Sequence, residues 1–153
     1  MKLSTLLVAG VTSIVLSGAA LAGNTAVVAQ TGGYNSSTVK QSGVSNSVQS
    51  YQFGAVNQSN IKQNGFVNNA GVLQVGGYNS SNVAQKGAFN TLNSAQIGGI
   101  NVSNASQKGF SNYAAVGQAG FINSSNLTQK GSFNAAGIGQ AGAFNFNTLT
   151  QKK

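Results

Sequence analysis

Residues Gln129–Gln140 read QKGSFNAAGIGQ, and the framework of this stretch recurs along the chain. Its fixed positions are Q-x-G-x-x-N, and the next glutamine then begins the pattern again, so the repeat is the eleven-residue step from Gln129 to Gln140. A fixed period of this kind is the sequence signature of repeat architectures and decides the fold before any local pattern does. The sequence therefore predicts a repeat protein from end to end.

The framework residues keep their phase throughout the repeats. Glutamine, taken as position 1 of each unit, occupies Gln30, Gln41, Gln52, Gln63, Gln74, Gln85, Gln96, Gln107, Gln118, Gln129, Gln140 and Gln151. Glycine at position 3 occupies Gly32, Gly43, Gly54, Gly65, Gly76, Gly87, Gly98, Gly109, Gly120, Gly131 and Gly142, and the series ends at Lys153. Asparagine at position 6 occupies Asn24, Asn35, Asn46, Asn57, Asn68, Asn79, Asn90, Asn101, Asn112, Asn123, Asn134 and Asn145.

Positions 6, 8, 10 and the next glutamine form a series with the period of two that places side chains on one face of a strand. Positions 8 and 10 are mostly small or apolar, whereas positions 7, 9 and 11 are rich in Ser, Thr, Asn, Lys and Gly. Positions 2 to 5 contain the fixed glycine, which permits the positive φ angles of tight turns. A glycine in every unit and the many Asn, Ser and Thr residues oppose a helix. Each unit is predicted to be a strand followed by a turn.

Alternate units differ, so the structural period is predicted to be two units. Every second unit carries Ser or Asn at position 8, and four of the turns that follow place a lysine after the glutamine, at Lys86, Lys108, Lys130 and Lys152. The intervening turns begin with Thr31, Phe53, Val75, Ile97, Ala119 and Ala141. We therefore expect an all-β, two-sheet β-solenoid of about six 22-residue coils with uncapped ends. One edge would carry a lysine column and the other a mostly apolar column.

The framework amides are predicted to face the interior. A buried amide without a hydrogen-bond partner costs roughly 2–7 kcal/mol. Stacked coils bring each amide next to an identical one about 4.8 Å above and below, where Asn and Gln side chains form hydrogen-bonded ladders. Strict identity at these positions is what such ladders require.

Composition argues against catalysis. The chain of 153 residues contains no Asp, Glu, His or Cys, the residue types on which acid–base catalysis and metal binding mostly draw. We therefore expect no enzyme activity, no metal site and no cofactor. The formal net charge is +8 and comes from lysine alone. Since no arginine is present to form bidentate hydrogen bonds with bases, we expect weak generic attraction to anionic polymers and no specific nucleic-acid binding.

Residues 1–22 are typical of a secretory signal peptide. Met1-Lys2 gives a positive start, Leu3–Leu16 is mostly apolar, and Ala20-Leu21-Ala22 matches an A-x-A cleavage site. A retained membrane anchor is the alternative, but it would need about 20 apolar residues with few interruptions. We predict cleavage after Ala22, secretion, and a repeat domain over residues 23–153.

The expected ends of the solenoid favour self-assembly. Soluble solenoids usually carry capping elements, and no capping pattern precedes Asn24 or follows Gln151 in this sequence. Each terminal coil would then offer unpaired backbone groups to another copy of the chain. Head-to-tail addition would continue the same cross-β stack.

These residues resemble the curlin repeats of bacterial functional amyloid, the fibre subunits of curli. The family pattern is S-x5-Q-x-G-x-x-N-x-A-x3-Q, and Gln129–Gln140 matches it from the first glutamine to the second. The similarity covers essentially Gly23–Lys153. It implies an extracellular amyloid fibre that serves adhesion and biofilm matrix. It also implies export through a dedicated outer-membrane channel and nucleation at the cell surface by a second curlin.

Two alternatives accompany this interpretation. Asn replaces the family's Ser at its first position, and neither the Gly-rich leader nor the Asp residues of some family repeats is found. Asn at that position and a basic C-terminus resemble the minor, nucleating curlin, whereas six regular coils suit the major subunit. The alternative of another class is a soluble monomeric solenoid that binds ice or polysaccharide through its outward column of Thr38, Asn60, Asn82, Asn104, Asn126 and Thr148.

Overall fold

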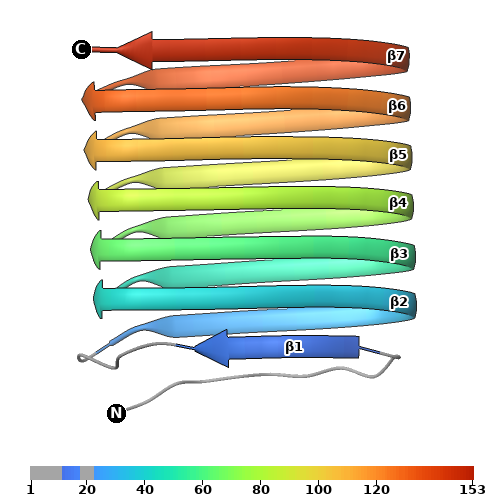
Figure 1. The fold of residues 1–153 in the computed structure, drawn as a ribbon, viewed down its shortest axis with the longest axis horizontal. Coiled ribbons are helices and arrows are strands. Elements are labelled where there is room, and N and C mark those ends of the chain that lie inside the picture. The colour runs from blue at the N-terminus through green and yellow to red at the C-terminus, as the bar shows by residue number, and fades with distance from the viewer. Residues whose placement is uncertain (1–11, 18–22) are drawn as a thin grey trace.

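The computed structural model describes residues 12–17 and 23–153 and forms a single stack of parallel strands. The strands are β1 (Thr12–Ser17), β2 (Thr25–Val44), β3 (Ser47–Phe66), β4 (Asn69–Ala88), β5 (Thr91–Phe110), β6 (Tyr113–Ser132) and β7 (Ala135–Lys152). Their spatial order is their sequence order, and every neighbouring pair is parallel. Figure 1 shows β2 to β7 as flattened coils that climb from one end of the molecule to the other.

The register between coils is the same throughout the stack. Gln30 pairs with Gln52 between β2 and β3, and Gln118 pairs with Gln140 between β6 and β7. Each framework residue therefore lies directly beneath its counterpart in the next coil. The prediction of an all-β solenoid with 22-residue coils is confirmed, and no helix occurs in the part of the chain that the structure describes.

The two corners of each coil differ more than the repeat pattern suggests. Each of β2 to β6 is one continuous strand of 20 residues that bends at its first corner, such as Thr31–Tyr34, without leaving the parallel sheet. The register skips a single pair at the first corner, such as Gly33 with Ala55. At the second corner the strand itself ends, and position 5 adopts a left-handed conformation, with φ of 51–57° at Ser45, Val67, Phe89, Ser111 and Phe133. The amide N–H at this position still donates to the preceding coil, as from Val67 to Val44 O at 2.9 Å.

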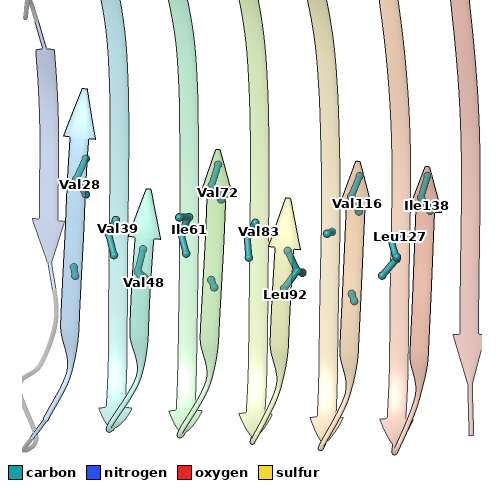
Figure 2. Close-up of a cluster of buried hydrophobic side chains, with 14 residues drawn as sticks. Val28, Val39, Val48, Ile61, Val72, Val83, Leu92, Val116, Leu127 and Ile138 are labelled. Atoms are coloured by element: carbon teal, nitrogen blue, oxygen red, sulfur yellow. The ribbon is translucent and has the colours of Figure 1, made fainter. Parts of the chain in front are cut away.

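The core lies between the two walls of the flattened coil (Figure 2). Along β2 to β6, burial alternates with the expected period of two on both sides of the first corner. Buried apolar side chains at positions 8 and 10 fill the middle of the interior, among them Val28 and Val39 in the first coil. Glutamine and asparagine side chains lie buried on either side of this apolar strip. The interior therefore combines an apolar centre with amide flanks.

Small and large core residues alternate at position 8 of the first wall over β2 to β5. In the first wall, the pair at positions 8 and 10 is Ala26 with Val28 in one coil and Val48 with Ser50 in the next. Leu92, the largest residue in this row, lies in the same coil as Ala105 on the opposite wall. Because close-packed interiors tolerate little change in volume, we expect a large residue on one wall to be accompanied by a small one on the same level, as Leu92 is by Ala105.

Strand β1 lies within the segment predicted to be a signal peptide. Its residues Thr12–Ser17 pair with Asn35–Lys40, the second half of β2. The remaining residues of that predicted segment, 1–11 and 18–22, lie outside the described residues, as does the cleavage site itself. Removal of residues 1–22 would leave the outer edge of β2 open along its length.

Candidate assembly interface

Two columns of buried glutamines run the length of the stack. Each glutamine Nε2 donates to Oε1 of the glutamine one coil later, beginning with Gln30 to Gln52 and Gln41 to Gln63. From Gln52 onward in the first column, and along the whole of the second, the donor–acceptor distances are 2.6–3.0 Å. Every glutamine link therefore points toward the C-terminal end.

Two columns of asparagines run beside them with the opposite direction. Each asparagine Nδ2 donates to Oδ1 of the asparagine one coil earlier, from Asn46 to Asn24 and from Asn57 to Asn35 onward, at 2.8–3.2 Å. Every asparagine link therefore points toward the N-terminal end. The structure brings together all the glutamines and asparagines that the sequence analysis singled out.

Backbone groups fix the direction of these links. From Gln41 onward, each glutamine Nε2 also donates to the carbonyl oxygen 16 residues earlier at 2.9–3.1 Å, as from Gln74 to Gln58 O. In one asparagine column the backbone N–H also donates to the preceding Oδ1, as from Asn68 to Asn46 at 3.1 Å. A rotated amide would set oxygen against carbonyl oxygen or nitrogen against N–H, so each orientation is determined by its surroundings.

The glutamine column that begins at Gln30 has a hydrogen-bond acceptor free at one end and a donor free at the other. Gln30 Oε1 is buried and accepts no hydrogen bond within the described part of the chain. At the other end, Gln140 Nε2 donates one of its two protons to Ser124 O at 3.0 Å, and the described residues provide no further glutamine above it. Strand β7 pairs only with β6 among residues 12–17 and 23–153. A glutamine acceptor thus lies at one end and a glutamine donor at the other.

The corner glycines are required by both conformation and space. Gly54 has φ of +126°, and a Cβ built on it would lie 2.0 Å from the carbonyl oxygen of Gly76 in the next coil. The same close approach recurs from Gly32 to Gly120. Wherever another coil follows, position 3 therefore admits no side chain, because the backbone of that coil occupies the space that a side chain would need.

The lysine column lies at the second corner and is longer than the sequence analysis proposed. Lys86, Lys108, Lys130 and Lys152 follow the glutamine of their coils, and all are exposed. In the first two coils, Lys40 and Lys62 precede the glutamine instead. Since the glutamine points inward, both flanking positions point outward, and the two sets form one basic strip that shifts sideways between the second and third coils.

A phenylalanine ladder, defined as Phe66, Phe89, Phe110 and Phe133, follows the same second corner. Successive rings meet edge to face, with centroids 5.4–5.7 Å apart and interplanar angles of 70–73°. Sequence reasoning missed this contact between the four rings. Their steps along the chain are alternately one residue longer and one residue shorter than the coil repeat, so an alignment in strict register does not superpose them.

A further asparagine column lies on the outer face of the second wall. Asn82 Nδ2 donates to Asn104 Oδ1 at 2.9 Å, and Asn104 Nδ2 donates to Asn126 Oδ1 at 3.1 Å. These amides are in contact with solvent, unlike those of the core. No helix of the described residues is long and apolar enough to cross a membrane, and the same residues contain no cluster of metal-binding side chains.

The comparison with known families identifies the repeat. The model of the curlin associated repeat matches residues 54–87 and 104–131. These segments are curlin repeats. They cover parts of β3 to β6, including the corner glycines Gly54, Gly87 and Gly131. Neither a curated protein nor a solved structure gave a match to the chain.

The curlin repeats account for the framework residues of the interface. Each matched segment contains the glutamines whose amides link one coil to the next, Gln63, Gln74 and Gln85 in the first and Gln107, Gln118 and Gln129 in the second. The curlin family consists of structural fibre subunits. Chemically, the arrangement pairs each strand with the strand of the next coil and each framework amide with an identical amide.

Proposed function

We propose that the chain is the structural subunit of an extracellular, curli-like amyloid fibre that grows by templated head-to-tail stacking of coils. The observation that carries this proposal is the opposite direction of the glutamine and asparagine ladders. If β2 of one copy extends the stack at β7 of another, the register between coils aligns Gln140 with Gln30 and Asn145 with Asn35. The Gln140 amide would then donate to the unpartnered Gln30 Oε1.

The asparagine ladder supports the same junction from the other side. Asn35 Nδ2 donates to Thr31 O at 2.9 Å and retains a second proton, which would meet Asn145 Oδ1 of the preceding copy. A junction between the N-terminal ends of two copies would instead bring the free glutamine oxygens of both copies together, with no donor between them. Buried polar groups without partners cost about 1–3 kcal/mol each, so the ladders favour one polarity of growth.

The positive charge opposes assembly only weakly. Two unit charges about 5 Å apart in water repel by roughly 0.8 kcal/mol before salt screening. The lysines of the basic strip are exposed and therefore screened. A coil junction gains a full row of backbone hydrogen bonds and four amide links, which together outweigh this repulsion.

Export and processing complete the proposal. A signal peptide ending at Ala22 would deliver residues 23–153 for secretion, with a dedicated outer-membrane channel and a second curlin subunit as partners. Cleavage would also remove β1, which pairs with Asn35–Lys40 at the edge where another copy would add. We accordingly place the mature chain at the cell surface, in adhesion and biofilm matrix, with no catalytic role and no cofactor.

Thioflavin fluorescence of purified Gly23–Lys153, unseeded and then seeded with its own sonicated product, tests the proposal. A lag phase that seeds abolish supports a fibre subunit. Growth without a lag, together with seeding of another curlin, favours the minor, nucleating subunit. A flat trace from a monodisperse folded monomer contradicts fibre formation and favours a monomeric binding protein.

A further inference from the structure

An open groove runs along the second wall of the stack, close to the second corner, and crosses four coils, β2 to β5. Its floor contains the buried glutamines of those coils, and its two sides are the residues that precede and follow each glutamine. One side consists of Lys40, Lys62, Ala84 and Ser106, and the other of Ser42, Asn64, Lys86 and Lys108. Each of these four coils thus contributes one lysine and, across the groove, one uncharged Ser, Asn or Ala side chain.

The groove has no counter-charge within the protein. The sequence contains no Asp and no Glu, so none of its lysines can form an ion pair with a side-chain carboxylate. The four groove lysines are exposed, and each is available to an external anion. Most protein surfaces intersperse charges of both signs. A row of cations in a groove without any carboxylate requires its anions from outside.

The spacing of the lysines selects the kind of anion. Parallel coils lie about 4.8 Å apart, so the groove offers one positive charge at about that interval along the stack. A glycan chain that carries one carboxylate on each sugar ring repeats its charge over a similar length. The small residues opposite the lysines leave room for sugar rings, and the Ser and Asn side chains offer hydrogen-bond partners for hydroxyl groups.

We propose that this groove binds a linear acidic polysaccharide, with Lys40, Lys62, Lys86 and Lys108 pairing with its carboxylates. The groove lies within a single chain, so binding does not depend on fibre growth. Head-to-tail stacking would place the lysines of successive copies in line and strengthen binding through multivalency. The partner would be a matrix polymer that the fibre cross-links.

Nucleic acid fits the same surface less well. Duplex DNA carries one charge per about 1.7 Å of its axis, well above the charge density of one lysine per coil. Single strands are usually held by aromatic rings on which bases stack. The rings nearest the basic strip, the phenylalanine ladder, are in edge-to-face contact with one another and leave no gap between successive rings for a base.

Fluorescence anisotropy of labelled polygalacturonate, titrated with the protein as soluble chain and as dispersed fibres, tests the proposal. The variant Lys62→Gln/Lys86→Gln removes two groove lysines, and the matched control Lys152→Gln/Lys153→Gln removes the same charge outside the groove. We expect the groove variant to bind at least about fivefold more weakly. In the soluble chain the control should lose less than about twofold, because Lys152 and Lys153 lie outside the groove and distant exposed charges are screened.

Three outcomes would overturn the proposal. Equal losses in the two variants would mean diffuse electrostatic attraction rather than a site. Unchanged affinity for the methyl-esterified, uncharged polymer would exclude pairing with carboxylates. Tighter binding of a single-stranded oligothymidylate than of polygalacturonate would assign the groove to nucleic acid. Seeded thioflavin growth measured on the same variants separates any of these from a failure to assemble.

Discussion

The interior and the exterior of this stack follow different rules. Inside, Gln and Asn recur at every level, and each amide binds the identical side chain of the next coil. On the outer face of the first wall, by contrast, one position carries Tyr51, Leu73 and Ala95 in successive coils, with no repetition of side-chain type. The difference indicates that the information for stacking lies in the interior, whereas the outer surface is available for other partners.

The corner glycines are expected to give the largest effect of any substitution, because they set the close contact between coils. In Gly76→Ala, the new Cβ would lie 2.0 Å from Gly98 O at a residue with φ of +127°. We expect the stacked coils to lose on the order of 3–5 kcal/mol of stability. The backbone of the next coil must move, and alanine is strained at this positive φ. The critical concentration for assembly, measured as protein left in solution, should rise by more than about 100-fold.

Gly137→Ala is the matched control for that substitution. Nothing lies within 4 Å of a Cβ built on Gly137, and Ala115 already occupies the equivalent position one coil earlier. Its critical concentration should change by less than about threefold, corresponding to roughly 0.5 kcal/mol. If the two glycines responded alike, close approach at the corner would not be what position 3 provides.

The amide ladders should differ with burial in the same way. Gln74→Ala removes links to Gln52 at 2.6 Å and to Gln96 at 2.8 Å, and leaves both of those buried amides short of a partner. We expect the fibre to lose about 2–4 kcal/mol of stability per chain. Asn82→Ala removes one solvent-exposed amide link, to Asn104, and should cost about 0.5 kcal/mol. Denaturation of fibres in guanidinium measures both.

The ranking of those two variants is the informative result. If Gln74→Ala and Asn82→Ala fibres dissolved at the same guanidinium concentration, buried amides would contribute no more to fibre stability than exposed ones. The interior would then stack through its apolar strip, and the direction of the ladders would lose its role in polarity.

A substitution at the second corner is expected to stabilise the fibre, by less than the preceding glycine and glutamine substitutions destabilise it. Val67 has φ of 51°, a conformation that is costly for a β-branched side chain, and its side chain is partly exposed. Val67→Asn should stabilise the coil by about 1 kcal/mol, because Asn tolerates this region. The guanidinium midpoint of fibre dissolution should rise. A lower midpoint would mean that the Val67 side chain contributes more through packing than it costs in backbone strain.

The repeat predicted what is periodic and missed what is not. The phase of Gln74 and Gly76 was enough to predict the coil length, the inward face and the register, because each depends only on spacing. The left-handed residue at position 5 carries no sequence signal, since Val67 and Phe89 are neither Gly nor Asn. The aromatic contact from Phe66 to Phe89 depends on that corner and spans one residue more than the coil repeat.

The groove and the polarity of the ladders also required coordinates. Lys62 and Lys86 stand on opposite sides of the glutamine position, so their common groove appears only once the coils are stacked. The direction of the Gln74 amide depends on a carbonyl oxygen 16 residues earlier, across the width of the coil. Spacing in the sequence contains neither relation.

The junction between copies can be tested directly by cysteine cross-linking, because the natural chain contains no cysteine. In the proposed fibre, position 150 of one copy aligns with position 40 of the next, and Thr150 and Lys40 are both exposed. Fibres grown from a mixture of Thr150→Cys and Lys40→Cys should form mixed disulfides on oxidation, since neighbouring strands meet the required Cα separation of about 4.4–6.8 Å. A mixture of Thr150→Cys and Lys62→Cys, one coil further away, should not. Cross-links joining two copies of Thr150→Cys would contradict head-to-tail stacking.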